Sequence, residues 1–298
     1  DGFDWADYQN APGAVVVSLA TGTSGGGDGV DTFRNIEGLR GSAFDDTLIG
    51  GAGGDWFRGR GGNDAIDGGA GEDWIDFSQA TNGVFVDLLA GTARGEGDDT
   101  LTRIEHVRGS AFDDWLIGDN GINLFRGGPG DDLIDGGMGF DIVDYTDNVA
   151  GVTVDLVAQT ADGPDGHDTL RSIAGAYGSA YVDTLIGNDD DNVFRGGDGA
   201  DILRGGEGQD VAMYNDAPAG IVVNLATGLR TGWAADDVFA SIEGIYGTDF
   251  DDVLTGDAQD NVFRGAGGTD TIDGGAGVDT LDYRSTSAVT IDFTAGTV

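Results

Sequence analysis

The sequence predicts an all-β protein with the architecture of a right-handed parallel β-roll, which is a kind of β-solenoid. Three observations support this prediction: a nine-residue repeat, an apolar residue at one place in every repeat, and 57 Gly among 298 residues. Asp supplies 48 of the 54 acidic residues. Because Asp and Gly favour turns, whereas Glu favours helices, we expect almost no helix.

The nine-residue repeat is clearest over residues 50–76, which read GGAGGDWFR, GRGGNDAID and GGAGEDWID. Each nonapeptide is close to the pattern G-G-x-G-x-D-x-U-x, in which U is apolar. The glycines permit crowded or left-handed backbone conformations. Asp at position 6 offers the hard carboxylate oxygen that Ca²⁺ prefers. The last three residues are expected to form a short strand that points its middle side chain inward.

A longer repeat organises the nonapeptides into four blocks. The segment GSAFDDTLIG at Gly41 returns in related form at Gly109, Gly178 and Gly247, at spacings of 68, 69 and 69 residues. Each block contains four nonapeptides, so block 1 covers residues 41–76. We therefore expect one continuous array over residues 1–298. Its long repeats cover residues 41–108, 109–177, 178–246 and 247–298, the last truncated, and a partial repeat covers residues 1–40.

The segments between blocks have a pattern of their own. An aromatic residue is followed by an alternating strand, such as residues 84–88, and then by a fifth, looser nonapeptide. This fifth nonapeptide is complete at Gly26, nearly complete at Gly163 and degraded at Gly232. A six-residue bridge, such as residues 35–40, leads into the next block. Both termini interrupt a repeat, and residues 289–293 begin another inter-block strand. We therefore expect the chain to be a segment of a longer array.

Position 8 is apolar in all sixteen block nonapeptides, which predicts a continuous core. Its residues are Leu48, Phe57, Ile66, Ile75, Leu116, Phe125, Ile134, Val143, Leu185, Phe194, Leu203, Ala212, Leu254, Phe263, Ile272 and Leu281. If two nonapeptides form one turn of the coil, each nonapeptide lies over the second one after it, about 4.8 Å away. Position 6 side chains from successive turns can then hold one cation between them. In block 1 the pairs would be Asp46 with Asp64 and Asp55 with Asp73.

The expected fold is therefore a β-roll with Ca²⁺ between stacked turns, and position 6 supplies the metal ligands. The residues at this position are Asp46, Asp55, Asp64, Asp73, Asp114, Asn123, Asp132, Asp141, Asp183, Asn192, Asp201, Asp210, Asp252, Asn261, Asp270 and Asp279. A complete block would hold two sites, hence about eight in all. A flexible Gly/Asp linker would need no apolar column. A calcium-free solenoid is the stronger alternative, but its stacked Asp rows would repel one another.

The whole chain resembles the RTX, or haemolysin-type calcium-binding, repeat family. The resemblance implies a calcium-binding β-roll that is exported by a type I system, folds on binding Ca²⁺ outside the cell, and stabilises or spaces its parent protein. It also implies weaker ligands in the inter-block nonapeptides at Asp31, Asp99 and Asp168. Asn at position 6 of the second nonapeptide in blocks 2 to 4 is expected to weaken those sites. Asp183 is a doubtful ligand because its loop lacks internal glycines.

Other functions find little support in the sequence. A net charge of −40 with no Lys argues against nucleic acid as a partner. No apolar run is long enough to cross a membrane. Adjacent acids such as Asp45 and Asp46 are interpreted as a ligand beside a solvated neighbour. We expect His106 and His167 to be incidental surface or turn residues. The segment is therefore interpreted as non-enzymatic.

Exposed aromatic residues leave one alternative open. Position 7 should point outward, and it carries Trp5, Trp56, Trp74 and Trp115. Trp56 and Trp74 should stack in neighbouring turns. Such a pair could bind the sugar rings of an extracellular polysaccharide or cell-surface glycan, as in an accessory module of a secreted polysaccharide-modifying enzyme or adhesin. Alternatively, the rings cover one another and shield the roll. A column of Arg residues beginning at Arg58 should also face outward and pair with acids.

Overall fold

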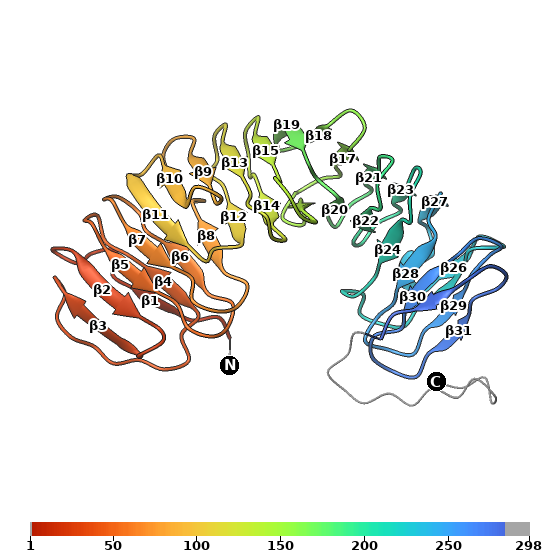
Figure 1. The fold of residues 1–298 in the computed structure, drawn as a ribbon, viewed down its shortest axis with the longest axis horizontal. Helices are drawn as coiled ribbons and strands as arrows, with labels where there is room; N and C mark the ends of the chain where they lie inside the picture. The colour runs from red at the N-terminus through yellow and green to blue at the C-terminus, as the bar shows by residue number, and fades with distance from the viewer. Residues whose placement is uncertain (1, 284–298) are drawn as a thin grey trace. The chain divides into compact units, whose positions relative to one another are not determined.

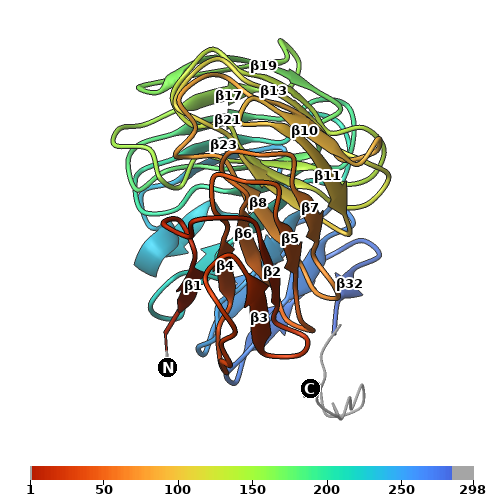
Figure 2. The same ribbon diagram turned by 90° about the vertical axis from the view of Figure 1, so that its left-hand side faces the viewer.

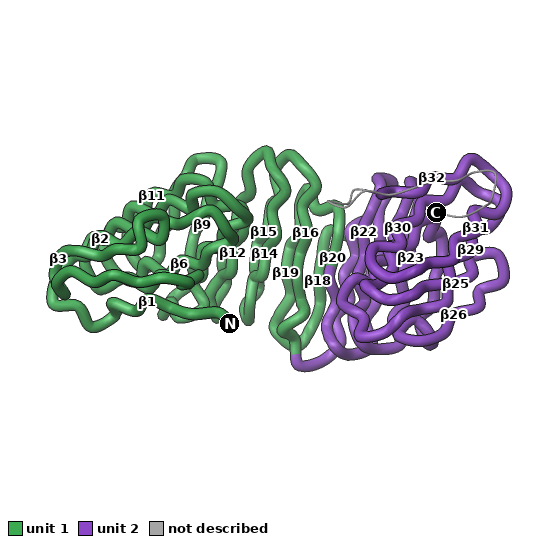
Figure 3. The backbone as a smooth tube through the Cα atoms, turned by 90° about the horizontal axis from the view of Figure 1, so that it is seen from below, with its two compact units in different colours: residues 1–148, 158–176 green, residues 149–157, 177–298 purple. Residues whose placement is uncertain are grey.

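The computed structural model describes residues 2–283, so the strand expected over residues 289–293 lies outside the described residues. The described chain is built from strands β1 to β32 and contains a single helical turn, η1 (Gly232–Ala234). It forms two compact units, which Figure 3 distinguishes by colour. Unit 1 comprises residues 1–148 and 158–176, and unit 2 comprises residues 149–157 and 177–298. The prediction of an all-β fold is confirmed.

Unit 1 consists of two rows of strands, which Figures 1 and 2 show side by side. The first row, in spatial order, is β1 (Trp5–Asp7), β4 (Gly38–Arg40), β6 (Trp56–Arg58), β8 (Trp74–Asp76), β12 (His106–Arg108), β14 (Leu124–Arg126) and β16 (Ile142–Asp144). The second row is β3 (Thr23–Gly26), β2 (Val15–Ser18), β5 (Thr47–Ile49), β7 (Ala65–Asp67), β11 (Asp98–Thr102), β10 (Thr92–Arg94), β9 (Phe85–Asp87), β13 (Trp115–Ile117), β15 (Leu133–Asp135), β19 (Gly166–Arg171) and β18 (Thr160–Gly163).

Successive nonapeptides alternate between the two rows, so each one pairs with the second nonapeptide after it. Leu48 of β5 is in register with Ile66 of β7, and Phe57 of β6 is in register with Ile75 of β8. Both pairings are parallel. Fourteen of the sixteen position 8 side chains are buried, and the two more exposed ones, Ile272 and Leu281, lie in block 4. The parallel β-roll and its period-nine core are therefore confirmed.

The inter-block segments contain a strand that the sequence did not reveal. In unit 1, β10 lies between β9 and β11 and pairs antiparallel with both. The fifth nonapeptide still joins the roll, because Leu101 of β11 is in parallel register with Ile66 of β7. Because β9 likewise pairs in parallel with β13, both strands belong to the roll, and β10 is an antiparallel strand inserted between them. Its β10 residues, Thr-Ala-Arg, carry neither the nonapeptide glycines nor a long apolar alternation.

Unit 2 repeats the same plan around blocks 3 and 4. One row contains β22 (Val193–Arg195), β24 (Val211–Met213), β28 (Gly244–Tyr246), β30 (Val262–Arg264) and β32 (Thr280–Leu281). Another contains β17 (Thr153–Asp155), β21 (Thr184–Ile186), β23 (Ile202–Arg204) and β27 (Val238–Ala240). A four-stranded sheet contains β26 (Leu229–Thr231), β25 (Val222–Asn224), β29 (Val253–Thr255) and β31 (Thr271–Asp273). Strand β20 (Gly175–Tyr177) begins in unit 1 and ends in unit 2.

Candidate calcium sites

The position 6 side chains form columns because each one lies immediately before a stacked strand. In block 1 the Asp46 amide donates to Asp64 Oδ1 at 2.8 Å, and the Asp55 amide donates to Asp73 Oδ1 at 2.7 Å. The same contact joins the corresponding pairs of the other blocks: Asp114 with Asp132, Asn123 with Asp141, Asp183 with Asp201, Asn192 with Asp210, Asp252 with Asp270, and Asn261 with Asp279. The structure thus brings together the residues that the sequence paired.

The carboxylates of the third and fourth nonapeptides have one oxygen without a partner. In blocks 1 to 3 this atom is Oδ2, and it is buried without a hydrogen bond. The six residues are Asp64, Asp73, Asp132, Asp141, Asp201 and Asp210. Each is at most 2% exposed. Because a buried charged oxygen without a partner is costly, these atoms mark places where the fold requires a proton or a cation.

Backbone carbonyls converge on the same places. In the fourth nonapeptide of block 2, a methyl group added at Gly136 would lie 2.6 Å from Asp141 Oδ2 and would also collide with the Ser172 carbonyl oxygen. At Gly68 it would lie 2.6 Å from Asp73 Oδ2 and collide with the Arg103 carbonyl oxygen. Only glycine at position 1 leaves this space open. The available donors are all oxygen atoms, which suits a hard cation such as Ca²⁺ better than a thiophilic metal.

Each site has few carboxylates. Within residues 2–283 no three His, Asp or Glu side chains gather into a metal-binding group. A cation between turns would therefore be held by one or two carboxylates, and backbone carbonyls would complete its coordination. The residues present fit Ca²⁺, which takes mixed sets of carboxylate and carbonyl oxygens.

Burial makes these carboxyl groups unusually basic in the metal-free protein. Desolvation, opposed by the hydrogen bond from the preceding turn, raises the pKa of Asp64 and Asp132 to about 8. It raises the pKa of Asp73 to about 7 and that of Asp141 to about 6. Neighbouring acids add to the effect. A divalent cation would reverse it, because an adjacent positive charge favours the ionised carboxylate.

The first nonapeptide of each block differs, because its Asp is fully hydrogen-bonded by the protein. Asp46 accepts the amides of Val15 and Ser42 at 2.8 and 2.5 Å and the Ser42 hydroxyl at 2.9 Å. Asp114, Asp183 and Asp252 have the same partners at corresponding positions. Asp183 is therefore no exception within this group. The signal in the sequence is Ser or Thr at position 2, where the other block loops have Gly, Arg, Asp, Asn or Ala.

The second nonapeptide of blocks 2 to 4 is also satisfied without a cation. In block 2, Asn123 Nδ2 donates to the Glu105 carbonyl oxygen at 2.8 Å and to Asp119 Oδ1 at 3.3 Å. In block 4, Asn261 Nδ2 donates to the Glu243 carbonyl oxygen at 3.1 Å. The amide thus supplies N–H donors to oxygen atoms that a cation would otherwise bind. Asn at position 6 therefore not only lowers the negative charge of the loop but also provides hydrogen-bond donors in place of a cation.

The inter-block Asp residues extend the column of the third nonapeptides. Asp99 Oδ1 accepts the Asp64 amide at 2.9 Å, and Asp168 Oδ1 accepts the Asp132 amide at 3.0 Å. Asp237 occupies the same place above Asp201, although its loop had seemed degraded. Sequence reasoning missed Asp237 because Gly232 to Ala235 have lost the glycine pattern.

Tyr hydroxyls cap several of the inter-block Asp residues. Tyr145 donates to Asp168 Oδ2 at 2.7 Å, and Tyr214 donates to Asp237 Oδ2 at 2.6 Å. Asp99 has Phe77 at the corresponding place in the long repeat and therefore lacks this donor. Asp31 is exposed and accepts the hydroxyls of Tyr8 and Ser24, but it lies outside any named strand and joins no stacked column.

The acids at position 5 are structural. Asp45 Oδ1 accepts the amide of Asn63, two nonapeptides later, at 2.8 Å. Asp113 accepts the Asp131 amide, and Asp131 accepts the His167 amide, both at 2.9 Å. These neighbours are exposed to solvent, as expected, but they also accept backbone hydrogen bonds from the next turn. Their side chains form a second ladder of hydrogen bonds that runs beside the candidate sites.

Two of the position 7 aromatic residues, Trp56 and Trp74, cover one another, whereas Trp115 is 47% exposed and meets Phe85 edge-on. The rings of Trp56 and Trp74 are stacked, with centroids 4.8 Å apart and an interplanar angle of 11°, as expected from their spacing. His106 packs against the other side of Trp74, with centroids 5.0 Å apart. Trp74 is consequently only 8% exposed. Because the indole faces are turned toward neighbouring turns, this arrangement does not support polysaccharide binding.

Both histidines lie in strands, and one is buried. His106 is 8% exposed in β12, and its Nδ1 accepts the Leu124 amide at 3.1 Å. The expectation that His106 is a surface or turn residue is therefore wrong, because the turns on either side cover it. His167 is exposed in β19 and contacts Asp162 at 2.5 Å. Burial lowers the pKa of His106, whereas the Asp162 carboxylate raises that of His167.

The Arg column pairs with acids in the next turn of the same row, as expected. Arg58 contacts Asp76 at 2.5 Å, Arg126 contacts Asp144 at 2.9 Å, and Arg264 contacts Asp282 at 2.5 Å. Arg126 also lies over the Trp74 ring, 5.4 Å from its centroid. These contacts link the turns from outside the core and lie away from the position 6 column.

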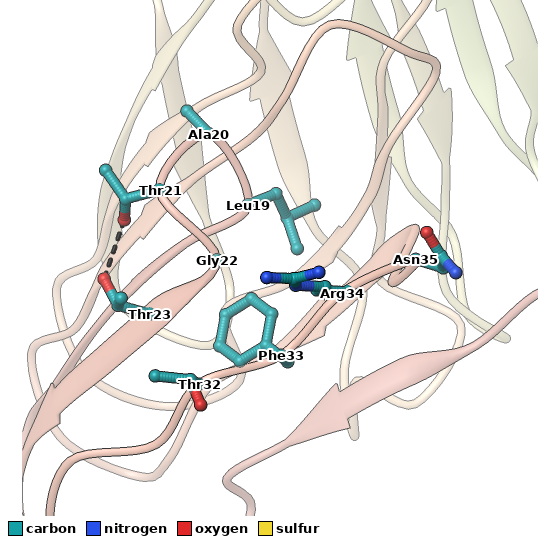
Figure 4. Close-up of a pocket in the computed structure, with 9 residues that line it drawn as sticks. All are labelled: Leu19, Ala20, Thr21, Gly22, Thr23, Thr32, Phe33, Arg34 and Asn35. Carbon is teal, nitrogen blue, oxygen red and sulfur yellow. Dashed lines mark hydrogen bonds between the residues drawn. The ribbon is translucent and has the colours of Figure 1, made fainter.

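A cavity of about 700 Å³ lies between the turn after β2 and residues 32–35. Figure 4 shows the Phe33 ring and the Arg34 side chain between these two segments. Arg34 is the one charged residue in the lining, which otherwise consists of apolar residues, Thr, Gly and Asn. The cavity therefore offers no acid–base pair or nucleophile–base pair for catalysis.

The fold and the oxygen-lined sites together define a parallel β-roll whose stacked loops are suited to bind calcium. Four copies of the model for the RTX calcium-binding nonapeptide repeat match the chain, at residues 40–75, 108–143, 177–212 and 246–281. The chain therefore belongs to the RTX calcium-binding nonapeptide repeat family. A comparison with curated proteins finds no match. Within the described residues, no helix is long and apolar enough to span a membrane.

Proposed function

We propose that this chain is the calcium-gated β-roll module of a protein exported through a type I system. The module stays unfolded at the low calcium concentration of the cytosol and folds outside the cell, where it acts as a structural spacer or stabiliser. It forms one continuous array whose long repeats cover residues 41–108, 109–177, 178–246 and 247–298. Its role is structural rather than catalytic.

The observation that carries this proposal is the set of buried Oδ2 atoms without partners. These atoms recur twice per block in blocks 1 to 3. In the ionised state they leave the fold with uncompensated buried charge, and the chain has a net charge of −40 that opposes compaction. Cations bound between turns would neutralise part of this charge. Their binding free energy would then contribute directly to folding.

The six unpartnered atoms favour the third and fourth nonapeptides as the principal ligands. We propose that Asp64, Asp73, Asp132, Asp141, Asp201 and Asp210 bind Ca²⁺ through Oδ2, and that Asp270 and Asp279 do so in block 4. Asp99, Asp168 and Asp237 support the sites above the third nonapeptides. About two ions per block are then expected.

Calcium titration after removal of metal with EGTA tests the proposal. Strand content, from circular dichroism, and hydrodynamic radius should change together as calcium is added. The midpoint should lie near about 10⁻⁴ to 10⁻³ M, the range of extracellular calcium modules. Magnesium at the same concentration should be much less effective, because it demands a smaller, octahedral site. A chain that is compact and rich in strands in EGTA at pH 8 would contradict the proposal.

A further inference from the structure

The bridges that precede each block are shortened nonapeptides. The 103–108 bridge reads Arg-Ile-Glu-His-Val-Arg, and its strand β12 pairs in parallel with β8, with Val107 in register with Ile75. Val107 thus occupies position 8, and Glu105 falls at position 6. The bridge thus completes with six residues the part of the turn for which a nonapeptide uses nine, and it lacks the glycine loop. This shortening concealed the correspondence in the sequence.

Glu105 makes the contact that a position 6 Asp makes elsewhere. Its Oε2 accepts the Asp73 amide at 2.9 Å, just as Asp73 Oδ1 accepts the Asp55 amide at 2.7 Å. In unit 2, Glu243 Oε2 accepts the Asp210 amide at 3.1 Å. Each bridge carboxylate therefore lies directly above a fourth-nonapeptide Asp that is fully buried and has an unpartnered Oδ2.

The backbone of the bridge directs a carbonyl toward the same oxygen. Arg103 has φ 52° and Ser241 has φ 52°, which are left-handed values that residues other than glycine seldom adopt. A methyl group at Gly68 would collide with the Arg103 carbonyl oxygen and lie 2.6 Å from Asp73 Oδ2. A methyl group at Gly205 would meet the Ser241 carbonyl oxygen and Asp210 Oδ2 in the same way. Such strain often accompanies a binding role.

We propose that the bridge glutamates are calcium ligands and that two cation sites lie at the junctions between a block and its bridge. The first site comprises Asp73 Oδ2, the Glu105 carboxylate and the Arg103 carbonyl. The second comprises Asp210 Oδ2, the Glu243 carboxylate and the Ser241 carbonyl. This inference rests on the proposed calcium-dependent folding and extends the ligand set beyond the nonapeptides.

The junction after block 2 provides a natural comparison. Its backbone is the same: Ser172 has φ 51°, and a methyl group at Gly136 would lie 2.6 Å from Asp141 Oδ2. The residue at the place of Glu105 is Ala174, whose amide still donates to the Asp141 carbonyl oxygen at 2.8 Å. The site at Asp141 therefore has one carboxylate, whereas the sites at Asp73 and Asp210 each have two. Its site should bind calcium more weakly than theirs.

The decisive experiment compares Glu105→Gln with Glu72→Gln in the full chain. Glu72 lies one turn below Glu105, directly before Asp73, and its side chain is 72% exposed, with Oε2 3.3 Å from His106 Nε2, so both changes remove the same charge from one region. Calcium stoichiometry is measured by equilibrium dialysis. Terbium luminescence sensitised by Trp74, which follows Asp73 in the chain, reports on the junction. Glu105→Gln should lose one ion, or bind it at least tenfold more weakly, and should lose most of the Trp74-sensitised signal. Glu72→Gln should change neither.

A gain of function provides a test that survives a folding defect in Glu105→Gln. Ala174→Glu should strengthen binding of one ion at least tenfold in calorimetry. If Glu105→Gln retains the full stoichiometry while Asp73→Asn loses one ion, Glu105 only caps an amide and the junction sites are refuted, although calcium-dependent folding stands. An Ala174→Glu variant without stronger binding also counts against the junction sites. If Asp64→Asn and Asp73→Asn both retain every ion, the proposed function itself fails.

Discussion

The two turns of block 2 have the same period but different chemistry. In the first turn, residues 109–126, Asp114 is hydrogen-bonded by Ser110, and the Asn123 amide donates to Asp119. In the second turn, residues 127–144, Asp132 and Asp141 each keep a buried, unpartnered Oδ2. The first turn is complete without a cation, whereas the second is not. We therefore propose that calcium dependence is concentrated in the second turns of blocks 1 to 3, and that each first turn provides a hydrogen-bonded surface on which the second turn can stack.

The largest effect should come from removing a second-turn carboxylate. Asp64→Ala should abolish one bound calcium and lower the free energy of unfolding in calcium by about 3–5 kcal/mol, as for a broken buried charge pair. Asp73→Ala should behave alike. Asn63→Ala, one residue away, should leave the stoichiometry unchanged, because Asn63 contacts only backbone amides and position 5 groups. Unaltered stoichiometry in both Asp variants would refute the assignment.

Acid should weaken calcium binding. In the metal-free fold the pKa of Asp64 and Asp132 is raised to about 8, so protons compete with calcium below that pH. The half-saturating calcium concentration should rise about tenfold per pH unit for such a site. These carboxyl groups have a higher pKa in the folded chain than in the unfolded chain, so their protonation stabilises the metal-free fold. This stabilisation is fully present below pH ~4 and is lost as the pH rises through ~6–8.

Two measurements check this pH dependence. In EGTA, strand content from circular dichroism should increase when the pH falls from 8 to 5. In the presence of calcium, a titration at pH 8 should give a lower midpoint than one at pH 6. Calcium affinity that is independent of pH over this range would mean that the raised carboxyl groups are not the ligands.

Converting a first turn to the chemistry of a second turn should have an intermediate effect. Asn123→Asp removes an amide donor and places a carboxylate beside Asp119, so it should destabilise the metal-free fold by about 2 kcal/mol. It should also add one calcium, measured by equilibrium dialysis. Block 1 already has Asp at this place, Asp55. If Asn123→Asp binds no additional ion, the Asn amide does not stand in for a cation.

The smallest effect should come from a purely hydrogen-bonded position. Ser110→Ala removes the hydroxyl that donates to Asp114 Oδ1 at 2.7 Å, while the Ser110 amide bond to Oδ2 remains. The loss should be about 1.5 kcal/mol, measured by chemical denaturation in saturating calcium. Calcium stoichiometry should be unaltered. A lost ion would show that the first turn also holds calcium through Asp114.

The fold could be predicted from the sequence because its core depends on a strict period. An apolar residue at position 8 and glycine at the loop positions specify the stacking of Phe57 over Ile75 without further information. The hairpin strand β10 was not predictable, because its residues carry no period and its pairing depends on the strands on either side. The burial of Trp74 and His106 was likewise hidden, since each is covered by residues from another turn.

The candidate sites could be predicted only in part. Position 6 identified the columns, but the state of each carboxylate depends on its neighbours at position 2 and in the next turn. In the first nonapeptides, Ser42 and its counterparts donate hydrogen bonds to the position 6 Asp. In the second nonapeptide of block 2, Asp119 accepts a hydrogen bond from Asn123. The position 6 side chains of both loops therefore have protein partners without a cation. Glu105 was concealed because its bridge is three residues shorter than a nonapeptide, and Asp237 because its loop keeps only the first glycine, Gly232. These features become recognisable only when the register of the turns is known.

The most direct test of the central claim is a crystal structure of the calcium-loaded chain with anomalous scattering from the metal. We expect ions about 2.3–2.6 Å from Oδ2 of Asp64, Asp73, Asp132, Asp141, Asp201 and Asp210, the distance typical of calcium. Asn123 Nδ2 should still donate to the Glu105 carbonyl oxygen, with no ion beside it. Ions bound at the first turns, with the six Oδ2 atoms left unoccupied, would contradict the account.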